Sequence, residues 1–124
     1  MSETPKSNSA LDTNCPINWE LMEQRSLDAE SLKLVLPIFI ENNCQYVSDL
    51  QQAWDEKDDQ AIESIAHTIK GSAANVGAEA LSHAAPELNH GCREGRLDGD
   101  AKKDLILQIK QLHEQLQEYI STLE

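Results

Sequence analysis

The chain is poor in aromatic residues, which make up 4% of its 124 positions. Strands of β-sandwiches favour aromatic and β-branched side chains, whereas packed helices build a core mainly from aliphatic residues and alanine. Hydrophobic residues of all kinds amount to 40% of the chain, which is ordinary for a folded protein. The composition therefore favours one helical domain of usual size and argues against wholesale disorder.

Basic residues are also scarce, because 10 Lys and Arg stand against 22 Asp and Glu, a net charge of −12 with neutral histidines. Binding to nucleic acid requires a basic face that neutralises phosphates, and the sequence has no Lys/Arg cluster of useful size. Anionic membrane surfaces are disfavoured for the same reason. We expect neither a nucleic acid nor a membrane as partner, and we interpret the acidity chiefly as a source of solubility.

The cysteines Cys15, Cys44 and Cys92 are odd in number and form no CxxC pair, so they predict reduced thiols and no disulfide framework. Long apolar runs are absent too. The longest, Leu34–Ile40, contains a proline and is too short to cross a bilayer. The N-terminus lacks the basic-then-apolar order of a signal peptide. We expect the protein, or this piece of it, to work in the cytoplasm.

Apolar spacing indicates the organisation of the chain. Residues 1–16 are rich in Ser, Thr, Asn and Pro without periodicity, and they predict a flexible tail or linker before a helical domain over 17–124. Within that domain the spacing predicts helices over 18–25, 28–54, 58–77, 79–94 and 99–122, and no strand. Asp28 and Asp58 are expected N-caps. Pro37 should kink or split the second helix, and Pro86 should interrupt and bend the fourth.

The predicted fold is all-α. Connections between the long helices are only a few residues long, so sequence neighbours must pack antiparallel. We expect an up-down-up-down four-helix bundle with the short first helix, carrying Trp19 and Met22 inward, as a lid. The apolar residues of the second helix recur mostly three or four residues apart, at Leu32, Val35, Leu36, Phe39, Ile40, Tyr46, Val47, Leu50 and Trp54.

The third predicted helix holds the most informative segment, IESIAHTIKGSAANVG, at residues 62–77. At about 100° per residue, six of its side chains fall within about 50° of one direction, which is the core. These are Ile62, Ile65, Ala66, Ile69, Ala73 and Val76. His67 lies about 150° from that direction and should face solvent. Lys70, Gly71 and Ala74 share its outward face over the next two turns.

This arrangement suits phosphoryl transfer. A neutral imidazole, with a pKa near ~6.5, can attack an acyl phosphate and form a phosphoramidate. Such transfer requires in-line geometry and charge neutralisation, which Lys70 would assist. Gly71 costs a helix on the order of 1 kcal/mol relative to alanine, but it leaves room for an approaching protein. We expect no cofactor of the chain's own, and Mg²⁺ would come from the partner's acidic pocket.

Each residue also has a plainer interpretation. An exposed histidine or lysine is usually ordinary surface, and Gly71 could serve a close helix–helix contact. His83, His90, Cys92 and perhaps Cys44 could ligate a metal. However, the two histidines are seven residues apart and lack the adjacent-turn spacing of His pairs at i and i+4, so no metal site is expected. His113 is expected to be a partly buried polar residue.

The run His67-Thr68-Ile69-Lys70-Gly71-Ser72-Ala73, followed by Gly77-Ala78, resembles the signature of histidine-containing phosphotransfer (HPt) domains of multistep phosphorelays. The expected helix order over Asn18–Leu123 is similar as well. The resemblance implies that His67 accepts a phosphoryl group from a receiver-domain phosphoaspartate and passes it to a second receiver aspartate. Lys70 would contact the phosphoryl oxygens, Gly71 would admit the receiver, and Gly77 would shape the following turn.

The resemblance also implies a docking surface. Gly71 and Ala74 would contribute to it from the third helix, and Asn89 and Arg93 from the fourth. Family members often carry a glutamine or another polar residue at the first of these fourth-helix positions, and some carry a basic residue at the second.

The implied function is that of a phosphocarrier without ATP-dependent kinase activity, monomeric, with receiver domains as partners, possibly those of a hybrid sensor kinase. Two alternatives stay open. One is the dimerising histidine region of a sensor kinase, but there an acidic residue and then a proline typically follow the histidine, where this chain has Thr68, Ile69 and Lys70. The sequence also lacks a Gly-rich nucleotide-binding segment, which argues against self-phosphorylation with ATP. The other is a helical interaction module in which His67 is incidental.

Overall fold

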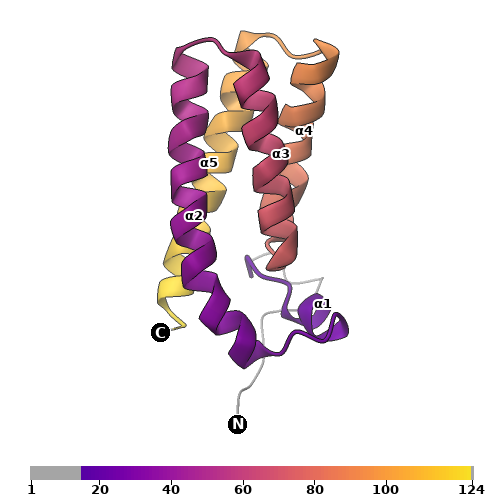
Figure 1. The fold of residues 1–124 in the computed structure, drawn as a ribbon, viewed down its shortest axis with the longest axis vertical. Coiled ribbons are helices and arrows are strands. Elements are labelled where there is room, and N and C mark those ends of the chain that lie inside the picture. Colours follow the sequence, from indigo (N-terminus) through magenta and orange to yellow (C-terminus); the bar gives the residue numbers. More distant parts are fainter. Residues whose placement is uncertain (1–14, 124) are drawn as a thin grey trace.

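The computed structural model describes residues 15–123, and every regular element in that range is a helix (Figure 1). Of the predicted tail, residues 1–14 lie outside the described range, and Cys15 and Pro16 are half-buried. The helices agree with the predicted ranges to within about two residues at each end. They are α1 (Trp19–Gln24), α2 (Ala29–Asp55), α3 (Asp59–Asn75), α4 (Glu79–Glu94) and α5 (Gly99–Ser121).

Capping side chains explain where the helices begin. In four of the five, an Asn or Asp at the N-cap accepts a hydrogen bond from the backbone N–H three residues on, which satisfies one of the free donors of the first turn. The expected caps Asp28 and Asp58 are confirmed. The four capping residues are Asn18, Asp28, Asp58 and Asp98. Gly95 ends α4 with a φ of 65°, in the left-handed region that favours glycine.

Neither internal proline ends its helix. Helix α2 continues through Pro37, and Figure 1 shows its first turns leaning away from the direction of the rest. Of the two outcomes predicted for this proline, the helix is therefore kinked and not split. A proline lacks the N–H that would bond to the preceding turn, so a lean at this position is the expected response. Helix α4 also runs unbroken through Pro86, so the interruption predicted there does not occur.

The four long helices form an antiparallel bundle in which α2 packs on α3, α3 on α4 and α4 on α5, and α5 closes the ring against α2 (Figure 1). The predicted four-helix fold is confirmed. The α2/α5 seam lies opposite the α3/α4 seam in this ring. No helix within residues 15–123 combines the length and apolar character needed to cross a membrane.

Most of the apolar residues whose spacing predicted the second helix lie in the core or pack against it, including Leu32, Leu36 and Leu50 at 0% exposure. Val35, one of the apolar residues whose spacing predicted the second helix, is 42% exposed, beside the exposed Leu34. Val35 lies about 60° from the centre of the buried stripe of α2, at its margin, where no neighbouring helix covers it. Ile106 on α5, which was not predicted, is buried.

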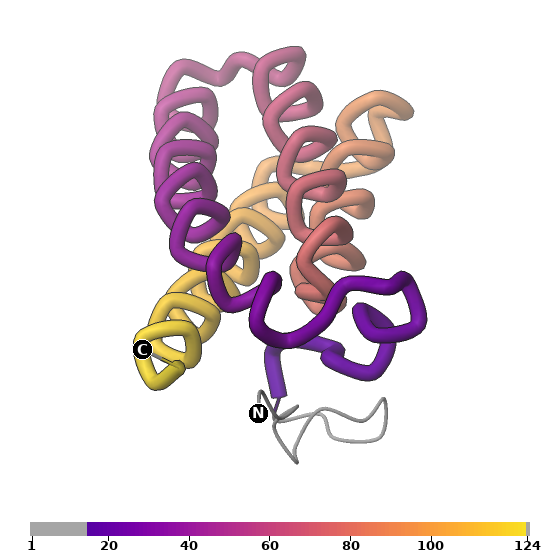
Figure 2. The backbone as a smooth tube through the Cα atoms, turned by 60° about the horizontal axis from the view of Figure 1, so that its bottom comes forward, coloured from indigo at the N-terminus to yellow at the C-terminus, as the bar shows by residue number. Residues whose placement is uncertain are grey.

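Helix α1 covers the end of the bundle at which α3 turns into α4 (Figure 2). The N–H of Asn18 donates to the carbonyl of Gly77 at 2.8 Å, and Trp19 Nε1 donates to the Tyr119 hydroxyl of α5 at 2.7 Å. Trp19 and Met22 are each 1% exposed, as expected for a lid. These contacts fix the far end of α3, the helix that carries the candidate site.

Candidate functional site

His67 lies in the middle of α3, and its side chain is exposed, as predicted. The opposite face of the helix is buried, with Ala66 and Ile69 both at 0% exposure. Ile65, predicted to face the core, is half-buried at the edge of that face. The amphipathic pattern of α3 therefore directs the imidazole out of the bundle.

The imidazole opens onto a hollow of about 340 Å³ between α3 and α4. Helix α3 contributes side chains from the two turns before the histidine, and α4 contributes two more from across the seam. The residues around it are Gln60, Glu63, Ser64, His67, Asn89 and Arg93. Of the predicted site residues, the structure thus brings together His67, Asn89 and Arg93.

Glu63 organises the α4 wall of this hollow. Its backbone carbonyl accepts a hydrogen bond from Asn89 Nδ2 at 2.8 Å, and its carboxylate pairs with Arg93 Nε at 2.9 Å. Sequence reasoning missed Glu63. Its spacing of four residues before His67, which puts both on one face of the helix, was the available signal.

The structure corrects the role expected for Asn89. Predicted to lie on the docking surface, it is only 2% exposed, and its amide joins α4 to α3 through Glu63. A buried side chain that is already hydrogen-bonded offers a partner almost no surface. Arg93 is different, because 57% of its side chain is exposed beside the hollow.

Lys70 and Gly71 lie one turn beyond His67, and both are exposed. Within residues 15–123, no hydrogen bond or ion pair holds the Lys70 amine. A Cβ added to Gly71 would meet no atom within 4 Å, so this glycine serves no close contact between helices. Ala74, one turn further, is half-buried, and its carbonyl accepts a hydrogen bond from Arg25 at 3.2 Å.

Gly77 has the structural role that was predicted for it. Its φ of 76° lies in the left-handed region, and an added Cβ would come within 3.1 Å of Met22 Cγ and 3.2 Å of the Asn18 carbonyl. The turn between α3 and α4 therefore requires glycine both for its backbone conformation and for the close approach of α1.

The other histidines lie apart from this site. His83 and His90 are exposed on α4, and within residues 15–123 no three His, Cys, Asp or Glu side chains gather as a metal site would need. His113 is more buried than predicted, at 5% exposure, and its Nδ1 lies 2.8 Å from Asn43 Nδ2 of α2.

The arrangement is that of an accessible nucleophile beside two cations. The imidazole is open to solvent, Arg93 lies across the hollow and Lys70 is one turn along the same helix. Glu63 is the one carboxylate among the side chains that surround the hollow. Such a site can accept a dianionic group from a partner that docks over α3, because cations near the group offset its charge.

Comparisons with known proteins agree with this chemistry. A family model described as the Hpt domain matches residues 35–120. Over 109 residues the chain is 30% identical to the phosphorelay protein LuxU of Vibrio vulnificus, in strain YJ016 and equally in strain CMCP6. The matched region covers 82% of this chain and 94% of each relative. No solved structure gives a significant match.

Proposed function

We propose that His67 is the residue that carries the phosphoryl group in this chain, which belongs to the Hpt domain family and is a histidine phosphotransfer intermediate of a phosphorelay. The observation that supports this assignment is the exposed imidazole at mid-helix, open to a hollow on one side and to the free space above Gly71 on the other. Among the histidines of the described chain, His67 combines exposure with both of these features.

The proposed reaction is a reversible transfer between an aspartate and this histidine. A ring nitrogen of neutral His67 attacks the phosphorus of a receiver's aspartyl phosphate, the N–P bond forms, and the P–O bond breaks with its electron pair on the aspartate carboxylate. In the second transfer, the carboxylate of another receiver attacks phosphorus and the N–P bond breaks. No ATP enters either step, so the chain acts as a carrier and not as a kinase.

Two cations of the chain would stabilise the carried group. Lys70 is placed to reach the phosphoryl oxygens from one turn away, and Arg93 to reach them from α4 after leaving Glu63. We propose that Mg²⁺ is supplied by the receiver's own acidic pocket and that the chain needs no cofactor.

We place docking on the outward face of α3, around Gly71 and Ala74, with Arg93 at its edge. The partners are receiver domains, including those of a hybrid sensor kinase. A monomer acting in the cytoplasm is sufficient for such brief encounters, because a small surface serves when the complex must separate quickly.

The test is transfer from a receiver domain that carries a radiolabelled phosphoryl group. The wild type and His83→Gln, a matched control that alters an exposed histidine on α4, should both become labelled. His67→Gln should not. Equal labelling of His67→Gln would overturn the assignment. Labelling of the wild type by ATP alone, without a kinase, would instead favour the dimerising histidine region of a sensor kinase.

A further inference from the structure

A second recessed surface runs along the α2/α5 seam. Two hollows, of about 480 and 110 Å³, meet at Trp54 near the C-terminal end of α2. We call this surface the Trp54 groove. Its principal side chains are Trp54, Lys57, Lys102, Lys103, Leu107 and Lys110. The smaller hollow lies on the α2/α5 seam, and the larger one extends to Asp59 at the start of α3, but neither shares a residue with the His67 hollow.

The charge of the groove is opposite to that of the molecule. Four of the chain's ten basic residues surround the two hollows together with two aspartates, which makes a net charge of +2 in a chain of −12. Lys102, Lys103 and Lys110 share one face of α5, and Lys57 follows α2, so the packing of α5 on α2 adds the fourth lysine to the three on α5.

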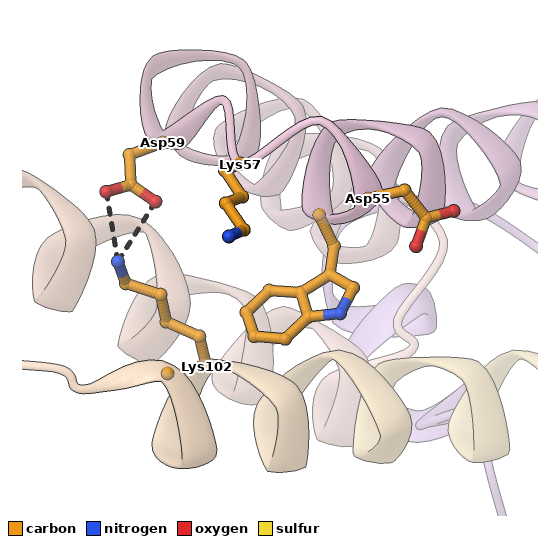
Figure 3. Close-up of a pocket in the computed structure, with 6 residues that line it drawn as sticks. Asp55, Lys57, Asp59 and Lys102 are labelled. Atoms are coloured by element: carbon orange, nitrogen blue, oxygen red, sulfur yellow. Dashed lines mark hydrogen bonds and ion pairs between the residues drawn. The ribbon is translucent and has the colours of Figure 1, made fainter.

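Two of the four amines are already engaged. Lys102 Nζ pairs with both carboxylate oxygens of Asp59, at 2.9 and 3.0 Å, and Lys110 donates to the Gln51 amide oxygen. Lys57 and Lys103 are exposed, and within the described residues neither side-chain amine makes a hydrogen bond or ion pair. Figure 3 shows the Lys57 amine directed into the hollow that Trp54 also lines, whereas the Asp55 carboxylate points away from that amine. The groove therefore presents two cations without acidic partners.

The groove also has an apolar side and an unused donor. Trp54 is half-buried, and 50% of Leu107 is exposed beside it. The chain's other tryptophan, Trp19, is buried and donates its Nε1–H to Tyr119, whereas the Nε1–H of Trp54 has no acceptor within residues 15–123. A tryptophan with one accessible apolar face and a free N–H is typical of protein interfaces.

We propose that the Trp54 groove binds an acidic segment of a partner protein, with carboxylates on Lys57 and Lys103 and apolar side chains on Trp54 and Leu107. Charge complementarity selects this occupant, because an acidic segment is attracted to the groove and repelled by most of the remaining surface. The groove shares no residue with the His67 hollow, so both surfaces can be occupied at once. The proposal does not depend on phosphoryl transfer by His67.

The test is an NMR titration of the full chain with a short peptide of alternating glutamate and leucine. The two tryptophans give two indole N–H signals, so the groove and the buried lid report separately. The Trp54 signal should shift saturably, and the Trp19 signal should stay in place. A peptide with lysine in place of glutamate should leave both unchanged, and His67→Gln should bind the acidic peptide as the wild type does.

Charge-reversal variants locate the binding. The double variant Lys57→Glu/Lys103→Glu should bind the acidic peptide about tenfold more weakly, because it replaces two attractions by two repulsions. The matched control, Lys33→Glu/Arg96→Glu, changes the net charge equally at positions outside the groove and should bind within about twofold of the wild type. Lys57, Lys103 and Arg96 are exposed and Lys33 is partly exposed, so melting curves should show that both variants fold.

Three results would overturn the proposal. They are the absence of a saturable Trp54 shift, an equal shift with the lysine peptide, and equal weakening in the two double variants. A Trp54 signal that moves when the protein alone is diluted would show that the groove pairs with a second copy of the chain, which also contradicts an acidic partner.

Discussion

At the scale of single residues, His67 shares its hollow with an ion pair that a phosphoryl group would disturb. Arg93 and Glu63 are joined at 2.9 Å, with 57% and 29% of their side chains exposed. A phosphoryl group brings close to two negative charges at neutral pH, so it repels the carboxylate and competes for the guanidinium. The stability of the carried group should therefore depend on the charges of Glu63, Arg93 and Lys70.

Lys70→Ala should shorten the lifetime of the phosphohistidine, or slow transfer, by about fivefold, because it removes a cation one turn from the imidazole. The measurement is a side-by-side comparison of half-life and transfer rate at neutral pH. Lys33→Ala, which removes a lysine from α2, is the matched control. Unchanged kinetics in Lys70→Ala would contradict the role given to this lysine.

Glu63→Gln should have the opposite effect and lengthen the phosphohistidine lifetime, by about twofold to fivefold. The substitution removes the repelling carboxylate and releases Arg93, while the backbone carbonyl of Glu63 still accepts from Asn89. The same half-life assay measures it. A shorter lifetime would show instead that Glu63 is needed to position Arg93.

Helical geometry alone was sufficient to predict that His67, Lys70 and Gly71 share an exposed face, because all three lie on one helix. It was not sufficient for Glu63 or Asn89. Their contacts depend on how α3 and α4 are aligned along their axes, and that alignment results from side-chain packing across the seam. Asn89 was therefore assigned to the surface, although it lies at the contact between the two helices.

At the scale of elements, α3 tolerates a glycine at mid-helix that nothing in the bundle requires. A Cβ at Gly71 would meet no neighbouring atom, so glycine weakens the helix without easing any contact. Pro86 in α4 also disfavours a helix, yet no interruption occurs there. Packing of α4 against its neighbours holds the helix together through this residue.

Gly71→Ala and Gly71→Gln should both raise the free energy of unfolding, by about 0.5–1 kcal/mol, through helix propensity. Their effects on transfer should differ. The alanine adds a single methyl group and should leave transfer from a receiver near normal, whereas the longer glutamine should block docking. Thermal melts and the transfer assay measure the two effects. Normal transfer by a well-folded Gly71→Gln protein would contradict a steric role for the glycine.

At the scale of the whole molecule, a buried polar pair joins α5 to α2. Asn43 is 0% exposed and His113 is 5% exposed, and within residues 15–123 the Asn43 Oδ1 has no hydrogen-bond partner. Burial holds the pKa of His113 below its ordinary value, against a smaller opposing effect of Glu114. The histidine is therefore neutral in the fold at pH values where it would be protonated in the unfolded chain.

Stability should consequently fall as the pH is lowered through about 6.5 and below, because the unfolded state then binds a proton that the folded state excludes. The melting temperature of the wild type should drop between about pH 7 and 5 by more than that of His113→Gln, which has no imidazole to protonate there. The slopes of the two proteins are compared, so a general loss of stability in the variant does not affect the result. Equal slopes would contradict the effect.

The bundle as a whole was predictable because short connections leave few ways to arrange four amphipathic helices. The Trp54 groove was not, because its lysines come from a turn and from one face of α5. Only the packing of α5 on α2 brings Trp54 and Lys57 beside the three lysines of α5. Local patterns thus predicted the elements and their order, and surfaces shared between distant elements had to come from the structure.

The attachment of α1 to the α3–α4 turn and to α5 has a consequence for any shortened version of this protein. The family match begins at residue 35, inside α2, and stops at residue 120. A polypeptide cut to those limits would lose Ile17, Trp19 and Met22, three of the most completely buried side chains. The end of the bundle at the α3–α4 turn, which α1 covers, would then be exposed to water. The stretch that the family match covers, 35–120, is therefore shorter than the stretch of chain that builds the core.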